Sequence, residues 1–200
     1  MDPKILADIH RYWFGDLASS GGNAPEEKMQ LWFRQSDATD ADIRERFGEY
    51  LDEARGADWN LAGLTREEQV GLVILLDQFP RNIFRVSADA FACDARARDV
   101  ARALLQQGVE RFLPVERPFL SLPFSHSENI ADQDFAVAFA ANQAVLAAEA
   151  DKEPARVVLD YATRHRDVVR KFGRFPHRNA MLSRESTADE DEFLKGGRGY

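Results

Sequence analysis

Two side chains that act as acids and bases in enzymes, His126 and Glu128, stand two residues apart in a Pro-Phe-Ser-His-Ser-Glu segment. A histidine and a carboxylate at a helix entrance can pass a proton to and from a ligand, so both are candidate catalytic residues. Ser125 precedes Glu128 by three residues, which is the spacing of a capping box that satisfies the first amides of a helix. The pattern therefore leaves both a catalytic and a structural role open for Glu128.

A second polar segment, Phe172-Gly-Arg-Phe-Pro-His-Arg-Asn179, joins a histidine to two arginines. Pro176 favours the start of a helical turn, so the residues after it are expected at a helix N-terminus. Backbone amides and guanidinium groups at such an end suit a phosphate or a carboxylate. We predict a catalytic role for His177 and ligand-binding roles for Arg174, Arg178 and Asn179.

The segment Leu76-Asp-Gln-Phe-Pro-Arg-Asn82 repeats part of this pattern. Asp77 follows Val70 and Val73 by seven and four residues, which places its carboxylate on an apolar helix face. A buried carboxylate needs a cationic partner or a raised pKa, and Arg81, Arg174 and Arg178 are the candidate partners. Two alternatives stay open: a structural ion-pair network, or ligand-binding roles for Asp77, Arg81 and Asn82.

Metal and cofactor chemistry have weaker support. His126, Glu128 and His177 would supply two imidazoles and a carboxylate, but their spacing matches no metal motif and the neighbouring arginines would repel a cation. The chain lacks the phosphate-binding, dinucleotide-binding and nucleophile-elbow motifs. We expect neither a metal nor a cofactor.

Two further reactive side chains fall on apolar helical stripes. Cys93 shares a stripe with Ala97 and Val100, which indicates a buried and unreactive thiol. His165 shares one with Tyr161 and Val168, which favours a core histidine.

Helical periodicity runs along almost the whole chain, and no alternating strand pattern is evident, so we predict an all-α fold. Capping boxes are expected at Thr65 with Glu68 and at Thr187 with Glu190. The run Val70–Leu76 is apolar all round, which is typical of a central helix. Helices are predicted at 3–13, 26–34, 38–55, 66–78, 88–107, 127–150, 154–172 and 187–195, with a proline-bearing loop at 113–123.

Length and composition set the wider bounds. The chain has 200 residues, a net charge of -8 and a single cysteine. We expect one all-α domain over residues 1–195 and a flexible tail over 196–200, with antiparallel helix pairs stacked as a compact bundle or a short tetratricopeptide-like array. The acidic balance opposes nucleic-acid binding, the longest apolar run is too short to span a membrane, and the lone cysteine favours a cytoplasmic location.

The motifs together resemble the domain of unknown function 924 family. They are Trp13-Phe-Gly15, Leu76–Arg85, Phe91-Ala-Cys-Asp94, Pro123–Glu128 with Gln133, and Phe172–Asn179 leading to Arg184. The family pattern has glycine before that last arginine, where this chain has Ser183. The resemblance implies an all-α fold like that of tetratricopeptide repeats, with no established activity, so it assigns no catalytic residue.

These observations favour a soluble protein that binds a small anionic ligand or a peptide carboxylate, with all nine candidate residues gathered over one pocket. Two alternatives remain: an enzyme that acts on such a ligand by His/Glu acid–base catalysis, and a helical scaffold that binds a protein partner.

Overall fold

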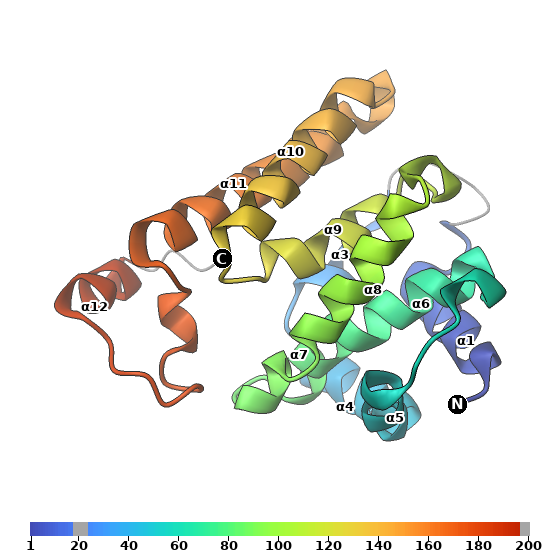
Figure 1. The fold of residues 1–200 in the computed structure, drawn as a ribbon, viewed down its shortest axis with the longest axis horizontal. Coiled ribbons are helices and arrows are strands. Elements are labelled where there is room, and N and C mark those ends of the chain that lie inside the picture. The colour runs from blue at the N-terminus through green and yellow to red at the C-terminus, as the bar shows by residue number, and fades with distance from the viewer. Residues whose placement is uncertain (18–23, 197–200) are drawn as a thin grey trace. The chain divides into compact units, whose positions relative to one another are not determined.

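The computed structural model describes residues 1–17 and 24–196, and within these residues the chain is helical without β-strands (Figure 1). The prediction of an all-α fold is confirmed. The helices are α1 (Pro3–Phe14), α3 (Glu26–Phe33), α4 (Asp37–Phe47), α5 (Leu51–Gly56), α6 (Arg66–Asp77), α7 (Phe79–Ile83), α8 (Asp94–Gln106), α9 (Arg117–Ser125), α10 (Ile130–Leu146), α11 (Lys152–Phe172) and α12 (Ala188–Lys195). In this part of the chain, no helix is both long and apolar enough to cross a lipid bilayer.

The contacts divide the chain into two compact units. The first comprises Met1–Arg85 and Asp89–Pro123, and the second comprises Val86–Ala88 and the chain from Phe124 onward. The expected single domain over residues 1–195 stays a prediction, and residues 197–200 of the expected tail lie outside the described residues.

Helix α6 forms the centre of the first unit. Every residue from Gln69 to Asp77 is buried, which confirms the central helix predicted from its apolar run. Helix α1 packs on α6 so closely that a Cβ atom at Gly71 would collide with the carbonyl oxygen of Leu6. Trp13 and Phe79 interlock edge to face beside this contact, with ring centroids 5.8 Å apart. The first unit is therefore held by a close helix pair and an aromatic core.

Helices α10 and α11 pack against each other along their length in the second unit (Figure 1). Gly173 ends α11 in a left-handed conformation, with φ at 71°, and its amide donates to the carbonyl of Val169 at 2.7 Å. The chain then runs through the 3₁₀ turn Pro176–Arg178 to α12. Phe175 is fully buried between these elements and packs with Val168 and Val169.

Two capping boxes are confirmed, at Thr65 with Glu68 and at Thr187 with Glu190. The capping box expected at Ser125 is wrong, because Ser125 is the last residue of α9 and the cap of α10 is Asn129, which accepts from the amide of Ala131.

The expected loop at 113–123 is also wrong in its second half, where α9 forms despite two prolines. Pro118 is the second residue of the helix, where no amide donor is needed, and Pro123 is accommodated close to the C-terminal end. A proline disfavours the helical conformation at the residue before it, yet Phe79, which precedes Pro80, is the first residue of the short helix α7.

The long helices predicted at 38–55 and 88–107 are each interrupted. The first passes through a 3₁₀ turn that begins at Gly48, a poor helix former, and resumes as α5. The second begins as a 3₁₀ turn over Ala88–Phe91, and α8 starts only at Asp94.

Candidate functional site

Six of the nine predicted site residues belong to the second unit, where two segments carry them. The connection between α9 and α10 holds His126 and Glu128, and the segment after α11 holds Arg174, His177, Arg178 and Asn179. Gln133 on α10 fixes the first of these elements, because its buried amide donates to the carbonyls of Ser125 and Ser127, on either side of His126, at 2.7 and 2.6 Å.

Glu128 joins the two segments. Its carboxylate accepts two hydrogen bonds from the guanidinium of Arg184, at 2.7 and 2.9 Å, and a third from the amide of Phe175 at 2.8 Å. Burial alone would raise the pKa of Glu128, but the bonds from Arg184 and Phe175 outweigh it and hold the pKa below its usual value. Glu128 is therefore an ionised carboxylate that ties residues far apart in the chain.

Arg174 and Asn179 make a neighbouring polar network. Arg174 forms a two-bond pair with Glu190, at 2.7 and 2.8 Å, and these bonds hold the pKa of Glu190 at about 2. Asn179 donates to Ser186 at 3.1 Å and accepts from Arg184 at the same distance. Arg174 also lines a cleft of about 410 Å³ with Lys171, Phe172, Thr187, Asp189 and Glu190.

Arg178, His165 and His177 lie against Phe175, and His126 interacts electrostatically with both of these histidines. The guanidinium carbon of Arg178, a residue only 6% exposed, stacks 4.5 Å above the Phe175 ring. The rings of His165 and His177 lie 5.5 and 5.6 Å from the same phenyl ring. We call His126, His165, His177 and Arg178 the histidine–arginine cluster.

Burial and neighbouring groups keep His165 and His177 neutral. Burial, together with the neighbouring His126, lowers the pKa of His165 to about 3. Desolvation by the surrounding protein and the charge of the adjacent Arg178 lower the pKa of His177 to about 4, while part of its side chain stays exposed to solvent. The Nδ1 atom of His165 lies 2.9 Å from the carbonyl oxygen of Tyr161, so Nδ1 carries the proton and the lone pair is on Nε2. His165 is buried, in agreement with the expected core position.

The other three predicted residues lie in the first unit. Asp77 is fully buried; Gln78 donates to it at 2.6 Å, and the guanidinium of Arg81 lies 3.6 Å away. Arg81 also makes a two-bond pair with Asp94, at 2.8 and 3.0 Å. Asn82 donates to Asp40 at 2.9 Å. The expected cationic partner of Asp77 is therefore Arg81, while the gathering of all nine residues over one pocket stays a prediction.

Two polar pairs of the structure were not predicted from the sequence: Glu128 with Arg184, and His10 with Glu116. Arg184 stands at the end of a motif, but nothing local predicts its partner Glu128. A buried pair of His10 and Glu116, 2.7 Å apart in the first unit, carries no sequence signal because 106 residues separate the two. Cys93 is buried as expected, and burial raises its pKa. Among the described residues, no three His, Cys, Asp or Glu side chains are close enough to hold a metal ion.

Comparisons with known proteins find a similar solved structure and a matching family model. A solved protein of unknown function from Agrobacterium tumefaciens shares 34% sequence identity with this chain and covers 97% of it, over 98% of its own length, with a TM-score of 0.74. No curated protein matches the chain. The model of a family described as bacterial proteins of unknown function, DUF924, matches residues 9–198. The chain therefore belongs to the DUF924 family.

Proposed function

We propose that the second unit binds a small anionic ligand, bearing a phosphate or a carboxylate, at the histidine–arginine cluster. The observation that carries the proposal is the composition of this cluster, in which the buried guanidinium of Arg178 and the imidazoles of His165 and His177 all lie against Phe175. Arg178 and Arg184 bring two positive charges to this region, and Glu128, which interacts with both arginines, brings one negative charge. The local field therefore favours an anion.

The neutral state of the histidines supports the same function. A neutral imidazole donates through one ring nitrogen and accepts through the other, whereas a protonated one donates through both. A bound anion stabilises the protonated form, so it raises the pKa of His177 from about 4 and gains a charged donor. Ligand binding is then accompanied by proton uptake, and the affinity rises as the pH falls from 7 toward 5.

The same geometry assigns a positioning role to Glu128 rather than proton transfer. Its two oxygens accept three hydrogen bonds from Arg184 and Phe175, and the lowered pKa keeps it ionised at neutral pH. A general acid needs a proton to give, which this carboxylate lacks, and a general base needs an oxygen available to the ligand, whereas both oxygens here are engaged by Arg184 and Phe175.

The test is thermal unfolding in the presence of inorganic phosphate and, separately, citrate. A ligand at 100 times its dissociation constant adds about 2.7 kcal/mol to the free energy of unfolding, which is visible as a rise in Tm. We expect such a rise for the wild type, a larger one at pH 6 than at pH 8, and none for Arg178→Gln. His177→Gln, a change at an exposed position, is expected to keep the fold and lose the pH dependence.

Arg170→Gln is the matched control. Arg170 is an exposed arginine on α11 that pairs with Asp134 at 2.9 Å, so its removal changes the net charge of the same unit equally. A Tm rise that persists in Arg178→Gln, or that disappears equally in Arg170→Gln, would place the anion elsewhere and contradict the proposal.

A further inference from the structure

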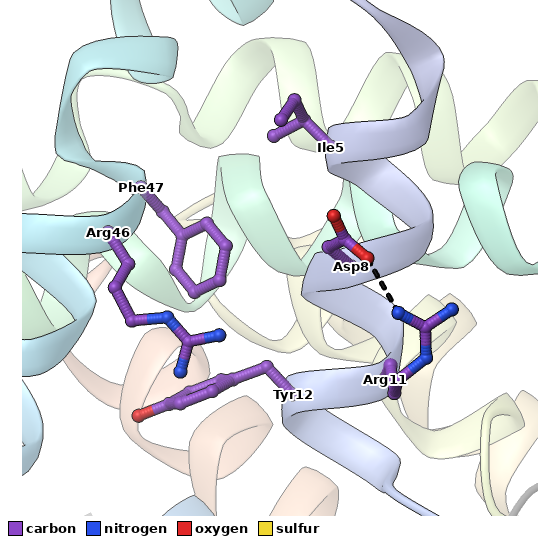
Figure 2. Close-up of a pocket in the computed structure, with 6 residues that line it drawn as sticks. All are labelled: Ile5, Asp8, Arg11, Tyr12, Arg46 and Phe47. Carbon is purple, nitrogen blue, oxygen red and sulfur yellow. Dashed lines mark hydrogen bonds and ion pairs between the residues drawn. The ribbon is translucent and has the colours of Figure 1, made fainter.

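A cleft of about 600 Å³ lies between α1 and α4 in the first unit (Figure 2). Small-molecule sites commonly fall between roughly 300 and 1,000 Å³, so its size suits a small organic ligand. Helix α1 contributes Ile5, Asp8, Arg11 and Tyr12 to the lining, and α4 contributes Arg46 and Phe47.

Aromatic packing builds a preformed apolar wall in this cleft. Phe47 is only 4% exposed, and its ring lies 5.5 Å from that of Tyr12 and 5.2 Å from that of Phe79. Tyr12 packs edge to face on Phe79 as well, at 6.3 Å. Because Phe79 belongs to the core of the unit, both cleft rings are fixed in place before any ligand arrives.

Arg46 is oriented by these rings. Its guanidinium carbon lies 4.7 Å from the centre of the Tyr12 ring and 4.9 Å from that of Phe47. Figure 2 shows the guanidinium of Arg46 over the Tyr12 ring. Asp42 is 3.5 Å from the guanidinium and accepts a hydrogen bond from the Tyr12 hydroxyl; burial and this bond raise the pKa of Tyr12. The stacked face of a guanidinium leaves its N–H donors along the edge, where they suit two-bond pairing with a carboxylate.

Arg46 is held less tightly by protein carboxylates than Arg81 of the same unit, which supports ligand binding at the guanidinium edge of Arg46. Arg81 is held by two short hydrogen bonds to Asp94, at 2.8 and 3.0 Å, while the contact between Arg46 and Asp42 is a single one at 3.5 Å between half-exposed side chains. On the opposite wall, Arg11 donates to Asp8 at 2.7 Å and offsets its negative charge. The cleft therefore combines an apolar wall with one oriented cation.

We propose that this cleft binds a small carboxylic acid with an apolar body, whose carboxylate pairs with Arg46 and whose body lies against Ile5 and Phe47. The site is separate from the histidine–arginine cluster and does not depend on the function proposed there. A carboxylate fits better than a larger oxyanion, because one guanidinium edge offers two parallel donors and Ile5 and Phe47 supply apolar surface in the same cleft.

The experiment measures binding of 3-phenylpropanoate by isothermal titration calorimetry, with 3-phenylpropanamide as the neutral analogue of the same shape. We expect saturable binding of the acid, and at least about tenfold weaker binding of the amide, because the charge-assisted pair is lost. Arg46→Gln is expected to weaken binding of the acid by about the same factor, and Arg46→Lys to restore only part of it.

Two further variants make the result specific. Arg55→Gln removes an exposed arginine of the same unit that pairs with Asp52 at 3.2 Å, and it should leave binding unchanged. Arg178→Gln alters the histidine–arginine cluster and should also leave it unchanged. The inference is overturned by absence of saturable binding, by equal binding of acid and amide, or by binding that survives Arg46→Gln and is lost in Arg178→Gln.

Discussion

Replacing His165 with asparagine is expected to flatten the dependence of stability on pH. His165 is buried against Tyr161 and Phe175, with ring centroids 3.9 and 5.5 Å away, and its pKa is lowered to about 3. An unfolded chain has a histidine pKa of about 6.5. Between these two values the unfolded state binds the extra proton, so the free energy of unfolding falls as the pH falls below about 6.5.

The magnitude follows from the distance between the assay pH and the unfolded pKa. A pH of 5 lies about 1.5 units below the pKa of histidine in the unfolded chain, so the unfolded histidine is protonated, while the folded one is still neutral. At about 1.4 kcal/mol per unit, His165 alone removes about 2 kcal/mol of stability between pH 7.5 and pH 5. His165→Asn has no group that titrates there, so it should lose about 2 kcal/mol less than the wild type over the same interval, whatever its stability at pH 7.5.

Chemical denaturation at pH 7.5 and pH 5.0, followed by circular dichroism, measures this difference. Circular dichroism is needed because all three tryptophans, Trp13, Trp32 and Trp59, lie in the first unit and their fluorescence would report that unit. Thr163→Ala is the control, since it removes a hydrogen bond of the same helix without removing a titrating group. Equal losses in wild type and His165→Asn would refute the reasoning.

Three other substitutions test the packing. Gly71→Ala should lower the free energy of unfolding by about 3 kcal/mol in a denaturant titration, because the new methyl group collides with the backbone of Leu6. Ser183→Gly should raise Tm through a gain of about 0.5–1 kcal/mol, because Ser183 has a φ of 53° that glycine adopts without strain; an unchanged or lower Tm would contradict this. Thr187→Ala should cost about 1 kcal/mol by removing the cap of α12, and Thr187→Ser should recover most of it.

Capping boxes show where sequence reasoning succeeds and where it stops. At Thr65 and Glu68 the interaction is local, so a spacing of three residues was enough to predict it. Ser125 and Glu128 have the same spacing, but the carboxylate of Glu128 meets Arg184, 56 residues later, and the helix begins beyond both. Glu128 therefore pairs with Arg184, which is distant in sequence, rather than with the local backbone. A short window of sequence contains no signal for such a distant partner.

The candidate site divides in the same way. Burial of Asp77 followed from its position on an apolar stripe, and its partner Arg81 stands one turn later, within reach of a local argument. The second partner of Arg81, Asp94, belongs to another helix and depends on packing. At Ser183 the structure explains a feature of the sequence. The family pattern has glycine at this position, and the left-handed backbone of Ser183 is a conformation that glycine adopts without strain.

What the arginines already hold distinguishes structural from functional candidates. Arg81, Arg174 and Arg184 each face a carboxylate in a two-bond pair, an arrangement that stabilises a fold without a ligand. Arg178 stacks on Phe175 near His165 and His177, whose pKa values are lowered, so this neighbourhood loses stability as the pH falls. An anion among these groups would favour their protonation and offset that loss. Phosphate should therefore stabilise the wild type most under mildly acidic conditions, where the cluster without a ligand is weakest.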